Sequence, residues 1–93
     1  MTKSSIYLIK GGSLFKIGRS KDINSRIKNL YTGSPVDLSI IHLRETANSA
    51  NVESRLHKYF SEYRHHGEWF KFDERQLDWV IETIDNFCCV GEK

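Results

Sequence analysis

A pair of adjacent glycines between two apolar runs is the feature that most constrains this chain. The stretch Ser5–Gly18 reads Ser-Ile-Tyr-Leu-Ile-Lys-Gly-Gly-Ser-Leu-Phe-Lys-Ile-Gly. Runs rich in Ile, Tyr, Leu and Phe are typical of strands, and two glycines readily supply the positive φ angles of a two-residue hairpin turn. The sequence therefore predicts a β-hairpin that turns at Gly11-Gly12 and brings Tyr7 opposite Lys16.

The two faces of this hairpin differ in polarity, because side chains alternate between the faces of a strand. One face is uniformly apolar and holds Ile6, Leu8, Phe15 and Ile17. The other face holds Tyr7, Ile9, Leu14 and Lys16. A hydrophobic core does not readily accept an unpaired ammonium group, so we expect the second face to carry the functional groups at its Tyr7–Lys16 end.

A helix and a further strand are predicted after the hairpin. Ser20 is the expected N-cap of the helix, with Asp22 in its first turn, and the turn Thr32–Pro35 ends it. The apolar stripe of this helix consists of Ile23, Ile27 and Leu30, and Arg26 lies at the edge of the stripe. The next segment, Val36–Arg44, is nearly all apolar, which indicates a strand covered on both faces and placed centrally in the sheet.

The second half of the chain predicts two more helices. The first has its candidate caps at residues 46–49, runs to about Tyr63, and has a broad apolar arc with Glu53 on its margin. Residues 64–67 are expected to form a loop, and residues 68–72 a short edge strand or an extended segment. A capping box at residues 73–76 opens the last helix, at 73–88, whose apolar stripe indicates a packing role. The expected fold is α/β, in the order β-β-α-β-α-α, with a small, mainly antiparallel three-stranded sheet flanked by helices.

Length and composition indicate one domain over residues 1–93, because a chain this short has no room for two cores. No apolar run approaches the ~20 residues that span a bilayer, and no signal peptide is recognisable, so we expect a cytoplasmic protein without membrane contact. The adjacent Cys88 and Cys89 form neither a disulfide framework nor a Cys-x-x-Cys motif. We expect reduced thiols, at least one of them packed against the core.

Positive charge is concentrated near the N-terminal hairpin, although the net charge is only +2. Six basic residues lie between positions 10 and 28, namely Lys10, Lys16, Arg19, Lys21, Arg26 and Lys28. Such clustering is compatible with a basic face for phosphate groups and equally with an ordinary solvated surface.

The order of these motifs resembles the GIY-YIG endonuclease superfamily. Ser-Ile-Tyr is followed by Phe-Lys-Ile-Gly, by Arg26 eight residues after Gly18, by Glu53 on the next helix and by Gly-Glu-Trp-Phe at 67–70. The similarity covers residues 5–72 and is greatest to the phage-borne branch with Lys-Ile-Gly in place of Tyr-Ile-Gly. It implies a GIY-YIG-like fold and metal-dependent hydrolysis of DNA phosphodiester bonds.

The resemblance also implies roles for individual residues. Glu53 would hold a single Mg²⁺ or Mn²⁺ ion, Arg26 would contact the scissile phosphate, and Tyr7 or metal-bound water would act as the base. One carboxylate completed by water and phosphate oxygens suits Mg²⁺, which dehydrates reluctantly. A guanidinium suits phosphate because its planar fork can donate two hydrogen bonds and stays protonated.

Two positions depart from the family pattern. Ser5 replaces the first glycine, which an ordinary strand conformation tolerates. Lys16 replaces the second tyrosine, and a protonated lysine can only donate hydrogen bonds, so it cannot take over as a proton acceptor. We expect Lys16 to neutralise a phosphate oxygen and, from its place opposite Tyr7, to favour the tyrosinate form.

Further candidates surround these residues. Arg19, Ser20 and Lys28 are expected to bind the DNA backbone, the first two at the N-terminus of the first helix, where backbone N–H groups attract phosphate. Strand parity places Arg19 on the opposite side from Lys16. His57 follows Glu53 by one helical turn and is a metal ligand, a second acid or base, or a polar flank.

A non-catalytic nucleic-acid-binding module is the rival interpretation, supported by the lysine at position 16. A structural or inhibitory phage protein that keeps only the scaffold is a third. A nuclease core of this size has little surface for reading DNA sequence, so specificity would require a homodimer or a partner protein.

Overall fold

The computed structural model describes residues 4–32 and 38–91 of the chain. The elements follow the order β1 (Ser4–Gly11), β2 (Leu14–Ser20), α1 (Ile23–Thr32), β3 (Leu38–Thr46), α2 (Ser49–Tyr59), β4 (Arg64–His66), β5 (Trp69–Phe70) and α3 (Leu77–Gly91). Short 3₁₀ turns at Ser61–Tyr63 and Glu74–Gln76 follow α2 and precede α3. Within these ranges, none of the helices has the length and apolar character needed to cross a membrane.

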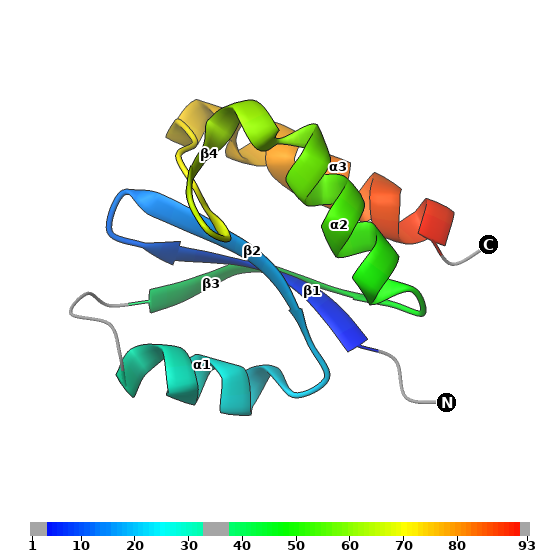
Figure 1. Ribbon diagram of the computed structural model, residues 1–93, viewed down its shortest axis with the longest axis horizontal. Helices are drawn as coiled ribbons and strands as arrows, with labels where there is room; N and C mark the ends of the chain where they lie inside the picture. Colours follow the sequence, from blue (N-terminus) through cyan, green and yellow to red (C-terminus); the bar gives the residue numbers. More distant parts are fainter. Residues whose placement is uncertain (1–3, 33–37, 92–93) are drawn as a thin grey trace.

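The centre of the molecule is an antiparallel sheet of five strands in the order β3-β1-β2-β5-β4 (Figure 1). The α/β class is confirmed, but the expectation of three strands is wrong. The addition is the short β4–β5 hairpin, which includes residues expected to form a loop. Gly67, at the turn of this hairpin, has a φ of 57°. No apolar alternation marks β4, because all three of its residues are exposed.

The N-terminal hairpin forms, with a register two residues away from the predicted one. Gly11 pairs with Leu14, so the turn residues are Gly12 and Ser13. Gly12 takes a φ of 63°, as in a type II′ turn, whereas Gly11 is buried, and a Cβ there would lie 2.8 Å from a Leu38 methyl group. Because the shift is an even number, the two faces keep the predicted residues, but Tyr7 lies opposite Gly18 and not opposite Lys16.

The third strand is an edge strand and not the central one. Strand β3 pairs with β1 alone among the described strands, and Ile40 and Leu43 remain 47% and 41% exposed. An apolar run by itself does not distinguish a central strand from an edge strand, because some side chains of an edge strand also pack against helices. The interior strands are β1, β2 and β5.

Helices cover both faces of the sheet, with α1 on one face and α2 and α3 on the other (Figure 1). The larger core lies under α2 and α3 and is built from Ile6, Leu8, Phe15, Ile17, Val52, Leu56, Phe60, Phe70, Phe72, Val80, Ile84 and Cys88. The smaller core, on the α1 face, consists of Tyr7, Ile9 and Leu38, with Ile23 and Trp69 packed against it. The hydroxyls of Ser4 and Ser49 are hydrogen-bonded and join the start of β1 to the start of α2.

The ends of the helices differ from the predicted ends. Helix α1 begins at Ile23, and its cap is Asp22: the carboxylate accepts hydrogen bonds from the backbone N–H of Ser25 (3.3 Å) and from its hydroxyl (2.9 Å). Ser20 is therefore not the N-cap; its hydroxyl accepts the N–H of Asp22 at 3.1 Å. The hydrogen bonds from Ser25 lower the pKa of Asp22. The predicted turn after α1 lies outside the described residues beyond Thr32.

The C-terminal elements follow the predicted pattern with one adjustment each. Helix α2 ends at Tyr59, which is half exposed and so does not belong to the buried arc. The capping box of Asp73 and Gln76 is present, but it opens the 3₁₀ turn that precedes α3. Cys88 is buried and Cys89 exposed, both as free thiols, as expected.

Candidate active site

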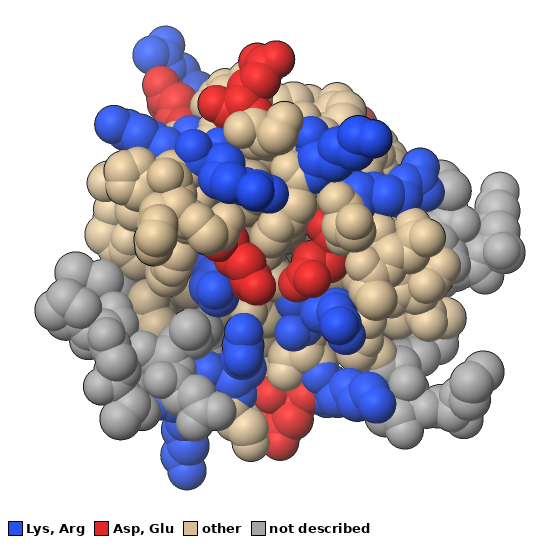
Figure 2. All heavy atoms as spheres, in the orientation of Figure 1, with Lys and Arg blue, Asp and Glu red and all other residues tan. Residues whose placement is uncertain are grey.

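The candidate site lies at the C-terminal half of β2, where this strand runs on beyond β5. Strand β5 pairs with β2 at Phe15 and Lys16, and α1 and α2 approach the following residues from opposite faces of the sheet (Figure 1). A hollow opens on this side of the molecule, with acidic side chains on both sides of it and Lys and Arg side chains around them (Figure 2). The predicted basic surroundings therefore include a pair of acidic groups.

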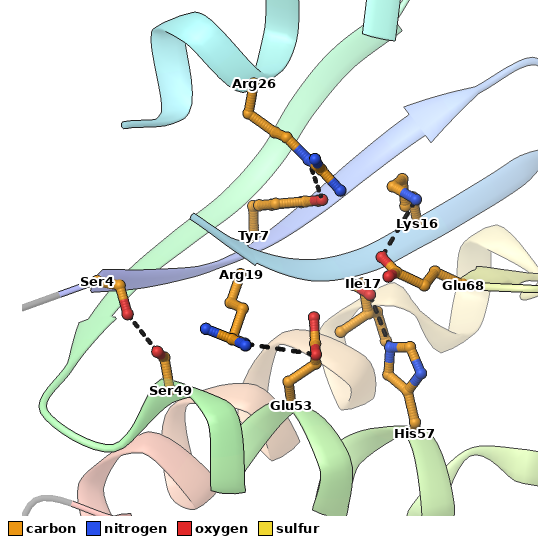
Figure 3. Close-up of polar contacts among 10 residues, drawn as sticks. All are labelled: Ser4, Tyr7, Lys16, Ile17, Arg19, Arg26, Ser49, Glu53, His57 and Glu68. Atoms are coloured by element: carbon orange, nitrogen blue, oxygen red, sulfur yellow. Dashed lines mark hydrogen bonds and ion pairs between the residues drawn. The ribbon is translucent and has the colours of Figure 1, made fainter. Parts of the chain in front are cut away.

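Arg26 of α1 and Tyr7 of β1 are in direct contact. The guanidinium Nε–H of Arg26 donates a hydrogen bond to the Tyr7 hydroxyl oxygen at 3.2 Å (Figure 3). Tyr7 is fully buried, and Arg26 is half-buried at the margin of the smaller core. The hydrogen bond to Tyr7 raises the pKa of Arg26, which therefore stays protonated. The sequence predicted both residues for the site, and the structure brings them together.

Gly18 makes room for the Tyr7 ring. Tyr7 and Gly18 are paired across the hairpin, and a Cβ at Gly18 would collide with the Tyr7 hydroxyl. The same Cβ would lie 3.0 Å from Oε1 of Glu68. The phenol and the Glu68 carboxylate therefore lie over the same glycine, which explains why the Lys-Ile-Gly motif ends in a residue without a side chain.

The pKa of Tyr7 is raised, contrary to the expectation of a favoured tyrosinate. Burial is the main cause; Arg26 acts in the opposite direction, and the negative charges of Glu68 and Glu53 add to the increase. The expected effect of Lys16 depended on the predicted pairing, and Lys16 lies opposite Ile9 instead. Tyr7 is thus a neutral phenol at physiological pH.

Lys16 and Glu68 form an ion pair beside Tyr7. The Lys16 Nζ lies 3.1 Å from Oε1 of Glu68 (Figure 3). It also lies 5.6 Å from the centre of the Trp69 ring. Lys16 is 8% exposed. Sequence reasoning singled out Glu68 without assigning it a role; the signal that could have found it is its position directly before a strand residue that pairs with Lys16.

Glu53 of α2 faces the site from the other side of the sheet. Its Oε1 lies 3.7 Å from Nε of Arg19, a distance that fits a loose ion pair, and its side chain is 23% exposed. As strand parity predicted, Arg19 lies on the opposite side from Lys16, on the α2 face. Its partner is the proposed metal ligand, so it has a place in the site that the sequence did not foresee.

Glu53 is a single carboxylate, 23% exposed, with the Arg19 guanidinium beside it. No group of three or more His, Cys, Asp or Glu side chains that could enclose a metal ion occurs within residues 4–32 and 38–91. A single carboxylate can still bind Mg²⁺ when water and substrate oxygens supply the remaining ligands. Glu53 is the residue that would provide this carboxylate.

His57 is held by the backbone of β2. Its Nε2 lies 2.7 Å from the carbonyl oxygen of Ile17, and since a carbonyl only accepts, Nε2 carries the hydrogen. Its ring packs edge-on against Phe70 at a centroid distance of 5.1 Å. Both contacts describe a polar flank that fastens α2 to the sheet, the third of the predicted alternatives.

Two further predicted DNA contacts are Ser20 and Lys28. The hydroxyl of Ser20 is used in the turn before α1, and the Asp22 carboxylate caps the helix N-terminus that was expected to receive phosphate. Lys28 is exposed on α1. The structure thus groups Tyr7, Lys16, Arg26 and Glu53 with Arg19 and Glu68, while the DNA contacts of Ser20 and Lys28 stay predictions.

Comparison with known proteins identifies the family. The family model of the T5orf172 domain matches residues 4–85, which is most of the chain. The chain therefore belongs to the T5orf172 domain family, a phage-associated domain often found in endonuclease-like proteins. No curated protein and no solved structure matches the chain.

Proposed function

We propose that this chain is a GIY-YIG-type endonuclease that hydrolyses phosphodiester bonds in DNA with the help of a divalent cation. One observation carries the proposal: Arg26, hydrogen-bonded to Tyr7, and Glu53, paired with Arg19, come from helices on opposite faces of the sheet and lie at the same part of β2 (Figure 3). A cation and an anion held around one point are the groups that phosphodiester cleavage requires. The family membership of the chain supports the same reaction class.

Arg26 is the proposed phosphate ligand. Its hydrogen bond to Tyr7 uses Nε, so the Nη groups of the guanidinium can donate to phosphate oxygens. Tyr7 orients this guanidinium and prevents it from turning away. Because the phenol is buried and neutral, Tyr7 acts as a positioning group here and not as the proton acceptor.

Glu53 is the proposed ligand of Mg²⁺ or Mn²⁺. When bound, such an ion polarises the phosphoryl group and makes water a stronger nucleophile at neutral pH. Arg19 beside Glu53 balances the carboxylate charge and can contact a neighbouring DNA phosphate. With little surface left for reading base sequence, a homodimer or a partner protein would supply specificity.

The test is cleavage of supercoiled plasmid with and without Mg²⁺ or Mn²⁺. We expect Arg26→Ala and Glu53→Gln each to slow nicking by about 10²–10³-fold, because each removes a charged group that acts in the transition state. Circular dichroism and thermal melting should show a folded protein in both cases. Arg75→Ala is the matched control, since Arg75 is 92% exposed and pairs with Asp73.

Normal nicking by the Arg26→Ala protein would contradict the assignment. A non-catalytic nucleic-acid-binding module is the second candidate. It is favoured by the Arg19–Glu53 ion pair, which partly neutralises the carboxylate that a metal would need. Retardation of the plasmid without nicking, under either cation, would decide for that module.

A further inference from the structure

We propose that Glu68 is the positioning residue of Lys16: it holds the Lys16 ammonium in the site, where that ammonium serves as a second phosphate ligand beside Arg26. The inference rests on the proposed function and adds to it a residue of the Gly-Glu-Trp-Phe motif. The β4–β5 hairpin, which carries this motif, thereby becomes part of the site.

The contact between Glu68 and Lys16 has an unusual form. Oε1 of Glu68 lies 3.1 Å from the Lys16 Nζ, and the Lys16 side chain is only 10% exposed. Yet this oxygen, itself shielded from solvent, has no hydrogen-bond partner within the part of the chain that the structure describes. The two charges attract each other at ion-pairing distance without the alignment of a hydrogen bond.

The backbone fixes the place of the Glu68 carboxylate. Trp69, the next residue, pairs with Lys16 across the β2–β5 ladder, and the N–H of Ile17 donates to the Glu68 carbonyl at 3.3 Å. The indole ring of Trp69 also lies beside the ammonium. Lys16 thus lies between a carboxylate and an aromatic ring that both belong to the same hairpin.

The ion pair with Glu68 stabilises the buried Lys16 ammonium when no substrate is bound. An unpaired charge of low exposure is costly, and Glu68 offsets this cost. Because Oε1 makes no aligned hydrogen bond, the ammonium can turn its N–H groups toward a phosphate without breaking one. The other charged groups that act on this part of the site are Arg26 of α1 and Glu53 of α2.

The Glu68 carboxylate has two opposite effects on the substrate. It keeps Lys16 in place, which favours the transition state, and it repels the phosphate as a nearby negative charge, which weakens binding. A residue that only supported the fold would have neither effect on a folded protein. The two effects can therefore be separated by measuring kcat and DNA affinity independently.

The experiment compares Glu68→Gln, Lys16→Met and the double variant with the wild-type chain. Affinity for a short DNA duplex is measured by fluorescence anisotropy in EDTA, and kcat by plasmid nicking with Mg²⁺. We expect Glu68→Gln to bind DNA about threefold more tightly at low salt, because a nearby negative charge is removed, and to lose about tenfold in kcat. Lys16→Met should weaken binding, because one phosphate contact is lost.

The double variant tests whether Glu68 acts through Lys16. In the Lys16→Met background, Glu68→Gln should lower kcat no further, since residues that act as a unit are not additive. Glu74→Gln is the matched control: Glu74 pairs with Lys10 at 3.2 Å on the exposed surface and should change neither quantity.

Three results would overturn the inference. The first is unchanged or weaker DNA binding by the Glu68→Gln protein, and the second is a multiplicative loss of kcat in the double variant. The third is a higher Mg²⁺ requirement of the Glu68→Gln protein, which would make Glu68 a metal ligand. A wild-type chain that binds DNA but never nicks it contradicts the proposed nuclease function. In that case the binding measurements still decide the role of Glu68.

Discussion

The two faces of the sheet are built differently. The face under α2 and α3 has a hydrophobic core of twelve buried residues among those that the structure describes. On the α1 face, the buried core residues that the structure describes are Tyr7, Ile9 and Leu38, and the Tyr7 hydroxyl accepts a hydrogen bond from Arg26. Lys16, buried and charged, shares this second face. Among the described residues, the first face thus holds the larger hydrophobic core, and the second holds a buried phenol and a buried ammonium.

The difference shows why the candidate groups gather where they do. A thick apolar core leaves no place for a guanidinium or an ammonium without a large desolvation cost. The α1 face is covered by one helix, and Arg26 on it is half-buried (Figure 1). Partial burial strengthens electrostatic interactions while leaving the groups within reach of a ligand. Glu53 and Arg19 belong to the other face but lie at its margin, where β2 runs on beyond β5.

The difference between the two faces predicts that the larger core contributes most to the free energy of unfolding. We expect Phe60→Ala to lower the free energy of unfolding by about 3–5 kcal/mol, because Phe60 is fully buried among aromatic rings. Tyr59→Ala, at the neighbouring half-exposed position, should cost about 1 kcal/mol. Urea denaturation measures both. Equal costs for the two variants, or a cost for Arg26→Ala that matches Phe60→Ala, would contradict this division.

Gly18→Ala would sharpen the comparison on the α1 face. The new Cβ collides with the Tyr7 hydroxyl, so the ring must move and the Arg26 contact must break. We expect a loss of about 1–3 kcal/mol in stability together with reduced nicking. Gly12→Ala is the contrast, because its Cβ would meet nothing within 4 Å but the residue has a φ of 63°. It should cost about 1–2 kcal/mol through backbone strain and leave nicking intact.

The smallest expected effect is the pH dependence of Tyr7→Phe. Burial raises the folded-state pKa of Tyr7 above the unfolded value of 10.0. The stability contributed by the neutral phenol is therefore present in full below that pH and is lost as the pH rises through the folded-state pKa. The wild-type urea midpoint should fall more steeply than that of the Tyr7→Phe protein from about pH 9 to about pH 11. Parallel curves would show that Tyr7 does not titrate with unfolding.

At neutral pH the same substitution should cost about 1 kcal/mol, the net contribution of the hydrogen bond from Arg26. Tyr63→Phe is the matched control, as a half-buried tyrosine outside the site. If Tyr63→Phe lowered the free energy of unfolding as much as Tyr7→Phe does, the loss could not be assigned to the hydrogen bond between Tyr7 and Arg26.

Local sequence patterns predicted a good part of the fold. The alternation in the first hairpin correctly placed Ile6, Leu8, Phe15 and Ile17 on one face and Tyr7 and Ile9 on the other, and the apolar stripe of α3 packs as expected. Periodicity is reliable here because one face of each element is strongly apolar. Periodicity did not predict that Gly12 would be a turn residue while Gly11 stays in β1. The position of Gly11 depends on the close approach of Leu38 and Trp69.

The contacts of the site could not be read from the sequence in the same way. The motif order predicted Tyr7, Arg26 and Glu53 as site residues, and the structure brings them to one part of β2. The ion pairs of Lys16 with Glu68 and of Arg19 with Glu53 join residues far apart in the chain. No local pattern specifies such pairs, because they depend on which strand and which helix lie beside β2.

The sequence by itself determined the α/β class, the polarity of each hairpin face and the residue types available for phosphate and metal chemistry, because these follow from local periodicity and side-chain chemistry. Only the tertiary structure decided the register of the hairpin, the edge position of β3 and the neutral state of Tyr7. Each of these depends on burial and on neighbours that come from other parts of the chain.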